Sequence, residues 1–135
     1  MNGGPNEPPR ILLAADDAQL RDILRLEVLT WRRGARVVTA AGGCEALVCL
    51  GRHDPHLLLL ELMMPGLDGF GIVWELDRHG LLPAQRIIVL TMMGPAEITR
   101  RGGLPPGVGL LAHPLDRGAL HAALDHGMAA IPAFR

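Results

Sequence analysis

Four consecutive leucines at positions 57–60 constrain the fold of this chain more than any other feature. A strand with one solvated face alternates apolar and polar residues, whereas an unbroken apolar run is typical of a strand buried on both faces. We therefore expect a central strand of a parallel sheet here. Glu61 follows at the carboxyl end of that strand. Ligands bind at this edge of open α/β sheets, which makes Glu61 a candidate functional residue.

The rest of the chain repeats this alternation of strand and helix. Short apolar segments predict four further strands at residues 11–15, 36–40, 86–91 and 109–112. Amphipathic segments predict helices that end before residue 32 and that span residues 43–52, 69–78, 95–101 and 116–128. The fourth helix is expected to be short because glycines and prolines surround it. This order predicts an α/β fold with a doubly wound parallel sheet and right-handed crossovers.

Length and composition limit the chain to one domain. We expect residues 1–9 to be disordered, residues 10–130 to form the domain, and residues 131–135 to be a tail. The net charge is −1 and all thirteen basic residues are arginines, so no overall field attracts nucleic acid or a membrane surface. Without a signal peptide or a long apolar run, the chain is expected to be cytoplasmic and to have no membrane partner.

Polar side chains follow four of the five predicted strands. The carboxyl ends of these strands share one edge of a doubly wound sheet, which is expected to bring together Asp16, Asp17, Glu61, Thr91 and His113. Three acids supply the oxygen ligands that Mg²⁺ prefers, threonine supplies a hydroxyl, and histidine supplies a titratable group. The sequence therefore predicts an acidic pocket formed by Asp16, Asp17 and Glu61.

Four segments at this mutual spacing, ILLAADD, LLLLELMMPGLDG, IIVLT and LLAHP, resemble the response-regulator receiver domains of two-component phosphorelay signalling, the CheY-like family. The resemblance covers about residues 10–130 and implies a flavodoxin-like (βα)5 sheet with strand order 2-1-3-4-5. It also implies that Asp16 and Asp17 hold Mg²⁺ with help from the backbone carbonyl of Met63. Asp17, Glu61 and Met63 are therefore the expected metal ligands.

Two further positions match the family and three depart from it. Thr91 matches the hydroxyl that moves toward a phosphoryl group, and Pro114 matches a proline that follows a cis peptide bond. Glu61 stands at the position of the phosphoaccepting aspartate, His113 at that of a lysine, and Leu110 at that of a switch tyrosine or phenylalanine. The extra methylene of glutamate displaces the carboxylate, and a displacement of about 1 Å can cost about a hundredfold in rate. The lost lysine leaves negative charge that Mg²⁺, a protonated His113 or a protonated acid would have to neutralise.

These departures predict an atypical receiver that is not an enzyme and works independently of phosphorylation. It is expected to signal by binding a protein, either a histidine kinase or a downstream effector, and Glu61 then either mimics the phosphorylated state or lies in an inert pocket. Homodimerisation through the fourth helix, fifth strand and fifth helix is a further expectation. The main alternative is a Mg²⁺-dependent phosphoacceptor with a working cycle. A small-ligand enzyme is disfavoured because no glycine-rich phosphate loop follows the first strand.

Other clusters have simpler interpretations. His53 and His56 are spaced like metal ligands but are expected in a solvated loop. Cys44 and Cys49 are expected to be buried, reduced thiols on one helix. The methionine pairs at 63–64 and 92–93 flank the predicted pocket and are interpreted as core or loop packing.

Overall fold

The computed structural model describes residues 7–131, except for the side chain of Leu67. The expected disorder of residues 1–9 and the expected tail at 131–135 therefore fall mostly outside the described residues. The elements follow in the order β1 (Arg10–Ala14), α1 (Ala18–Trp31), β2 (Arg36–Ala40), α2 (Gly43–His53), β3 (Leu57–Glu61), β4 (Met63–Met64), β5 (Leu67–Asp68), α3 (Gly69–Arg78), η1 (Ala84–Arg86), β6 (Ile87–Thr91), α4 (Pro95–Arg100), β7 (Gly109–Ala112) and α5 (Arg117–Ala129).

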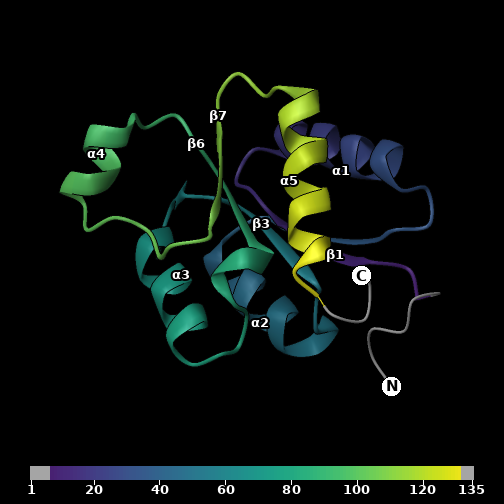
Figure 1. Cartoon of the computed structure of the whole chain (residues 1–135), viewed down its shortest axis with the longest axis horizontal. Coiled ribbons are helices and arrows are strands. Elements are labelled where there is room, and N and C mark those ends of the chain that lie inside the picture. The colour runs from purple at the N-terminus through teal and green to yellow at the C-terminus, as the bar shows by residue number, and fades with distance from the viewer. Residues whose placement is uncertain (1–6, 132–135) are drawn as a thin grey trace.

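Five of these strands form one parallel sheet in the order β2-β1-β3-β6-β7. This is the expected order 2-1-3-4-5, because β6 and β7 are the fourth and fifth strands of that sheet. In Figure 1, α1 and α5 lie together on one side of the sheet, and α2 and α3 lie on the other. Strand β3 is central, as the leucine run predicts, and Leu57 through Leu60 are all buried.

The sheet separates two apolar clusters, and successive residues of each central strand alternate between them. Leu57 and Leu59 join the cluster beneath α1 and α5, which also holds Leu24, Val28, Leu120, Leu124 and Met128. Leu58 and Leu60 join the cluster beneath α2 and α3, which also holds Ala46, Phe70, Val73 and Leu76. A strand buried on both faces needs apolar residues at every position, which explains the absence of alternation in the sequence.

Three local features refine the sequence-based prediction. Helix α4 is short, as expected, and stands apart from the other helices at the left of Figure 1. The segment after β3, expected to be a turn, contains an antiparallel hairpin of β4 and β5. Gly69 then begins α3, where an added Cβ would lie 2.2 Å from the backbone oxygen of Leu62. Only glycine permits this close approach, which holds the hairpin against the helix.

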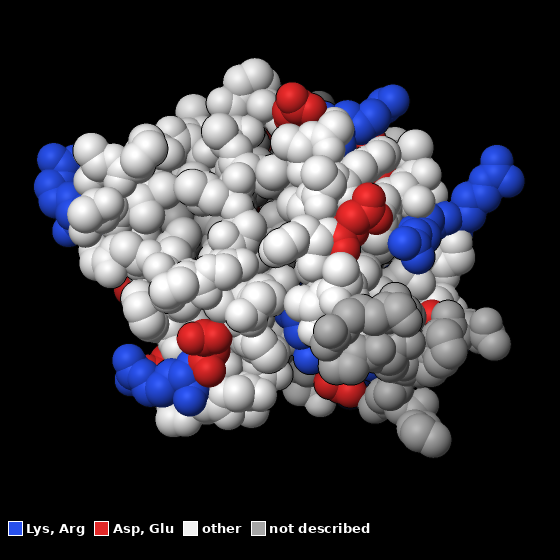
Figure 2. Space-filling view, in the orientation of Figure 1, with Lys and Arg blue, Asp and Glu red and all other residues white. Residues whose placement is uncertain are grey.

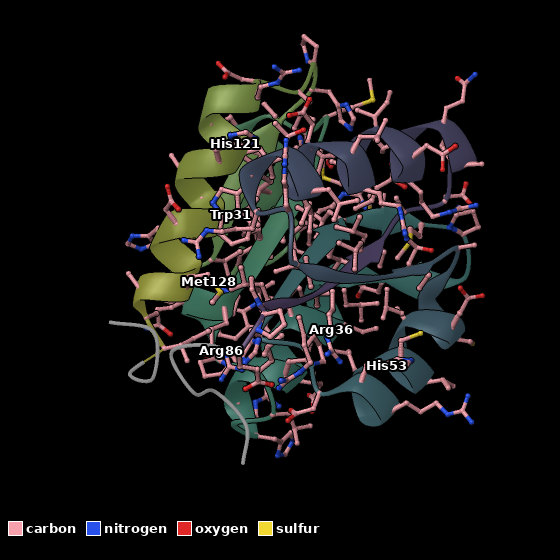
Figure 3. The ribbon with its side chains drawn as sticks, turned by 90° about the vertical axis from the view of Figure 1, so that its right-hand side faces the viewer. Trp31, Arg36, His53, Arg86, His121 and Met128 are labelled. Atoms are coloured by element: carbon pink, nitrogen blue, oxygen red, sulfur yellow. The ribbon has the colours of Figure 1, made fainter. Side chains whose placement is uncertain are left out.

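Polar contacts join α1 to α5 along their length. The indole nitrogen of Trp31 donates to Asp125 at 2.9 Å, and the guanidinium of Arg117 pairs with Glu27 at 2.9 Å. His121 lies 3.4 Å from the same glutamate. Figure 3 shows Trp31 and His121 at this contact between the two helices. These contacts hold α1 against α5 on the side of the sheet opposite to α2 and α3.

His56, at the amino-terminal edge of the sheet, is buried, so the expectation of a solvated loop was wrong for this residue. Only 3% of His56 is exposed, and its Nδ1 accepts a hydrogen bond of 2.9 Å from the backbone nitrogen of Arg10. Arg86 donates to the carbonyl oxygen of His56 at 2.8 Å. His56 is buried because the central strand begins at the next residue, whereas His53 is exposed as expected. Figure 3 shows His53 and Arg86 near this edge.

The two cysteines are free, and the expectation that both are buried was wrong. Cys44 is exposed and Cys49 is half-buried. Both lie on α2, where Cys44 falls in the first turn on the side away from the sheet, while Cys49 packs against the cluster that contains Leu58.

Among residues 7–131, no helix is long and apolar enough to cross a membrane.

Candidate functional site

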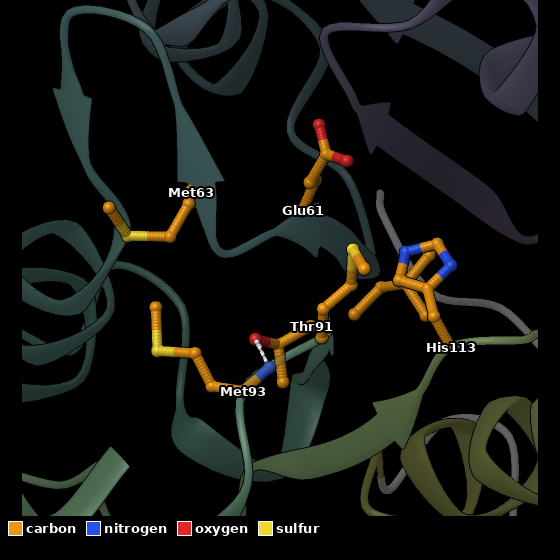
Figure 4. A pocket seen from close by; sticks show the side chains of 7 residues that line it. Glu61, Met63, Thr91, Met93 and His113 are labelled. Carbon is orange, nitrogen blue, oxygen red and sulfur yellow. Dashed lines mark hydrogen bonds between the residues drawn. The ribbon is translucent and has the colours of Figure 1, made fainter. Parts of the chain in front are cut away.

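A cavity of about 260 Å³ opens at the carboxyl ends of β3 and β6. Its lining consists of Glu61, Met63, Leu90, Thr91, Met92, Met93 and His113. Figure 4 shows these residues converging from β3, β4, β6 and the segments after β6 and β7, with Glu61 on one side and Thr91 and Met93 on the other. The site therefore lies at the sheet edge where the sequence places it.

Glu61 is the last residue of β3 and is half-buried. Its Oε1 accepts a hydrogen bond of 3.0 Å from the backbone nitrogen of Asp16, in the segment that joins β1 to α1. This bond draws the carboxylate toward the end of β1, because the longer glutamate side chain can reach that neighbouring segment. One oxygen of Glu61 is thus engaged by the backbone, and the other has no hydrogen bond or ion pair to any described residue.

The structure does not bring Asp16 and Asp17 into the cavity lining. Both are exposed. Asp17 is the N-cap of α1, where its Oδ1 accepts hydrogen bonds from the backbone nitrogens of Gln19 at 2.7 Å and Leu20 at 3.4 Å. The residue buried at the end of β1 is Ala15, which carries no polar group. Of the three acids expected in the pocket, only Glu61 lines it.

A guanidinium group organises the backbone beside these acids. Arg21 donates to the carbonyl oxygens of Ala15 at 2.8 Å and of Asp16 at 3.0 Å. The chain turns here from β1 into α1, so two carbonyl groups that no strand satisfies receive a charged donor. Sequence reasoning missed Arg21, whose only signal was its place on the first turns of the helix after the acidic pair.

Thr91 and His113 lie where they were expected. Thr91 is buried, with 5% exposed, and its Oγ1 accepts a hydrogen bond of 3.0 Å from the backbone nitrogen of Met93. The hydroxyl proton of Thr91 is therefore available to a group in the cavity. His113 is half-buried, and its backbone nitrogen donates to the carbonyl of Thr91 at 3.2 Å. The peptide bond between His113 and Pro114 is cis, as the resemblance implies.

Leu110 does not line the cavity. It lies on the edge strand β7, opposite Val89 of β6, and is 50% exposed. A leucine at this place leaves an apolar side chain in water and offers no ring or hydroxyl to Thr91. Leu110, which the resemblance places at the switch position, can therefore act only through apolar contact.

Three methionines form the mouth of the cavity, in agreement with the expectation that the methionine pairs flank the pocket. Met63 is 46% exposed and Met92 is 86% exposed, while Met93 is half-buried. The available signal was position, since Met63 lies two residues after Glu61 and Met92 and Met93 come directly after Thr91. Thioether side chains are flexible and apolar, which gives the cavity adaptable walls.

The described donors were tested for their fit to Mg²⁺. Among residues 7–131, no three histidine, cysteine, aspartate or glutamate side chains lie close enough together to hold a metal ion. Asp17 is turned into its helix cap and Glu61 toward the backbone of Asp16. Mg²⁺ is usually held by one or two carboxylates together with waters, and the described side chains form no larger cluster of acids around Glu61.

Five parallel strands in this order, with polar groups at the carboxyl ends of the central ones, define a doubly wound α/β protein with its site near the point where the strand order reverses. The sequence model described as the response regulator receiver domain matches residues 11–125. The chain belongs to this family, whose members receive signals in two-component systems and are in general signalling modules.

Relatives and solved structures agree with this assignment. The chain is 35% identical to the transcriptional activator protein PfeR of Pseudomonas aeruginosa over 118 residues, which are 87% of this chain and 37% of PfeR. It is 41% identical to the transcriptional regulatory protein AfsQ1 of Streptomyces coelicolor over 83 residues, which are 62% of this chain and 35% of that protein. The chain thus spans about a third of the length of these relatives.

Two solved structures share the fold. The signal receiver domain of a DNA binding response regulator from Colwellia psychrerythraea superposes with a TM-score of 0.75 at 22% identity, covering 87% of this chain and 95% of that one. Chemotaxis protein CheY4 of Vibrio cholerae superposes with a TM-score of 0.71 at 22% identity, covering 88% and 98%. At this identity the likeness establishes the fold alone.

Proposed function

We propose that this receiver domain transmits its signal by binding a protein partner and does so without a phosphorylation cycle. Receiver domains in general exchange signals with histidine kinases and effectors. One observation carries the proposal: Glu61 stands at the end of β3 with its carboxylate hydrogen-bonded to the backbone of Asp16. A nucleophile for phosphoryl transfer must be aimed in line with the phosphorus atom, and this bond instead holds one of the two carboxylate oxygens at the backbone.

Charge also supports the proposal. Phosphoryl transfer depends on cations that neutralise the equatorial oxygens of the transferred group. No lysine exists in the chain, and the cavity lining contains no arginine. One oxygen of Asp17 is used in a helix cap, and Glu61 is the only carboxylate among the described residues that lines the cavity.

The alternative function is a Mg²⁺-dependent phosphoacceptor, in which Asp17, Glu61 and the carbonyl of Met63 hold the ion. It requires the carboxylates of Asp17 and Glu61, each of which has one oxygen in a backbone hydrogen bond, to turn toward a shared ion. The membership of the family favours it, while the present hydrogen bonds oppose it. It predicts a labile adduct that forms only when Mg²⁺ is present.

The deciding experiment is incubation with Mg²⁺ and acetyl phosphate, followed by intact-mass spectrometry. Wild type is expected to gain no phosphoryl group. A double variant, Glu61→Asp with His113→Lys, restores the shorter acid and a permanent cation, and it is expected to gain one. Glu61→Asp alone separates the contribution of side-chain length from that of charge.

A phosphoryl group on wild-type protein would refute the proposal and favour the alternative. Glu61→Gln then serves as the control, because loss of the adduct in that variant would map the modification to Glu61. If neither wild type nor the double variant reacts, the block lies in the metal donors, and the proposal for wild type stands.

A further inference from the structure

The cavity combines one carboxylate with walls that are almost entirely apolar. Besides Glu61, Thr91 and His113, every lining residue is a leucine or a methionine. No ion pair among residues 7–131 includes Glu61. A half-buried carboxylate without a cation is costly, so the site favours a ligand that brings positive charge.

The basic groups nearest to the site are already engaged. Arg21 donates to two backbone carbonyls, and Arg101, which lines the adjoining groove with Met63, pairs with Glu97 at 2.8 Å. In Figure 2, charged side chains lie mainly around the rim of the visible face, and its middle carries few. The cavity lining contains no arginine, so a permanently charged partner for Glu61 has to come from another molecule.

The shape and lining of the cavity identify the kind of cation. A divalent metal ion requires several oxygen ligands, and the lining offers a single carboxylate. A volume of about 260 Å³ is smaller than the roughly 300 Å³ at which pockets for drug-sized ligands begin, so it suits one side chain. Lysine and arginine side chains have an apolar stem and a charged head, which match the methionine walls and Glu61 respectively.

We propose that the cavity receives a basic side chain from a protein partner, with its stem against Met63, Met92 and Met93 and its charged head at Glu61. Thr91 and His113 border the place of the head and can supply further hydrogen bonds. The inference rests on the proposed function, because a cation from the partner would occupy the space that a phosphoryl group would otherwise use. The exposed thioethers of Met63 and Met92 are the first surface that such a side chain meets.

The test uses n-butylguanidinium as the probe and measures its binding to the full chain by chemical-shift titration in ¹H–¹⁵N spectra, in buffer with EDTA and no phosphodonor. Saturable shifts are expected at residues that line the cavity. Glu61→Gln should weaken binding at least about tenfold, because a hydrogen bond to a charged group is lost. The matched control is Glu75→Gln, which makes the same change at an exposed position on α3 and should leave the affinity unchanged.

Two further measurements keep the proposal falsifiable. The neutral isostere n-butylurea should bind at least about tenfold more weakly than the cation. His113→Lys supplies an internal ammonium group and should likewise weaken the probe, which provides a second variant if Glu61→Gln does not fold. Absence of saturable binding, equal binding of the neutral probe, or equal losses in Glu61→Gln and Glu75→Gln would overturn the proposal. Phosphorylation of wild type would instead refute the proposed function. Mass spectrometry and the chemical-shift titration therefore distinguish the two failures.

Discussion

Glu61 is the residue on which the interpretation of this receiver depends. Its carboxylate reaches the backbone nitrogen of Asp16, beside the end of β1. The acid therefore both ties β3 to the end of β1 and presents its second oxygen without a described partner. His113, which the resemblance places at the position of the family's lysine, adds an imidazole to the cavity but forms no ion pair with Glu61 among the described residues.

A second residue, His56, makes stability depend on pH. Burial, followed by the nearby charge of Arg10, lowers the pKa of His56 below its ordinary value of 6.5. The folded protein thus keeps the imidazole neutral at pH values where the unfolded chain binds a proton. The unfolded state then takes up more protons, so the free energy of unfolding should fall as the pH drops below about 6.5, until the folded imidazole is itself protonated.

The slope of this pH dependence is the measurable quantity. Between the two pKa values, His56 should contribute up to about 1.4 kcal/mol per pH unit. Urea unfolding at several pH values is expected to show a shallower decline for His56→Gln than for wild type. His126→Gln, which removes an exposed histidine of α5, is expected to keep the wild-type slope. Equal slopes for wild type and His56→Gln would contradict the prediction.

Among the helices, α1 depends on an aspartate that family resemblance assigns to metal binding. Asp17 caps the first turn through the backbone nitrogens of Gln19 and Leu20. Replacing a capping aspartate by alanine costs about 1 kcal/mol, whereas asparagine preserves the acceptor. We therefore expect Asp17→Ala to lower the free energy of unfolding by about 1 kcal/mol and Asp17→Asn to have a much smaller effect.

Asp116 gives the matched control, because it caps α5 through the backbone nitrogen of Ala119 at 3.1 Å, far from any expected metal ligand. Asp116→Ala should cost a similar amount. Thermal unfolding of all variants with and without Mg²⁺ completes the measurement. If Mg²⁺ stabilises wild type but not Asp17→Asn, then Asp17 serves the metal, and the capping interpretation is incomplete.

A hydrogen bond from α3 holds the segment that follows helix α4. The indole nitrogen of Trp74 on α3 donates to the carbonyl oxygen of Gly103 at 3.0 Å. Gly102 and Gly103, with φ values of 107° and 72°, lead the chain away from α4 in a conformation that other residues rarely adopt. The sequence could predict where α4 ends, but not which neighbour would hold the segment after it.

The whole molecule depends on a sheet that is covered on both faces, and β3 links the two sides. Leu58 and Leu59 are each 1% exposed, yet they belong to opposite clusters. Replacing either with alanine should cost about 2–5 kcal/mol, because a buried leucine leaves a cavity behind. Since both clusters share the same strand, each variant is expected to unfold in one cooperative transition.

Calorimetry and denaturant unfolding with two probes would check this cooperativity. Leu81→Ala is the control, since Leu81 is 71% exposed and its loss should change the free energy of unfolding by less than about 0.5 kcal/mol. A biphasic transition in Leu58→Ala alone would show that the face covered by α2 and α3 can unfold separately from the rest.

The sequence by itself determined the order of elements, the parallel sheet and the edge that bears the site. These follow from local properties, because unbroken apolar runs specify strands buried on both faces, and caps and glycines mark the helix ends. The positions of Glu61, Thr91 and His113 could be predicted from the strands, because each of these residues ends or follows a strand. The family assignment depended on the same motifs.

Only the tertiary structure decided which side chains actually meet. Asp17 follows Asp16, whose backbone bonds Glu61, yet the side chain of Asp17 caps α1. Three methionines from two separate segments line the cavity. His56 looked like a loop residue and is buried by the central strand that follows it. The physical reason is common to all of these residues: strand and helix signals are local in sequence, whereas a side chain's partners are set by segments that only the packed fold brings together.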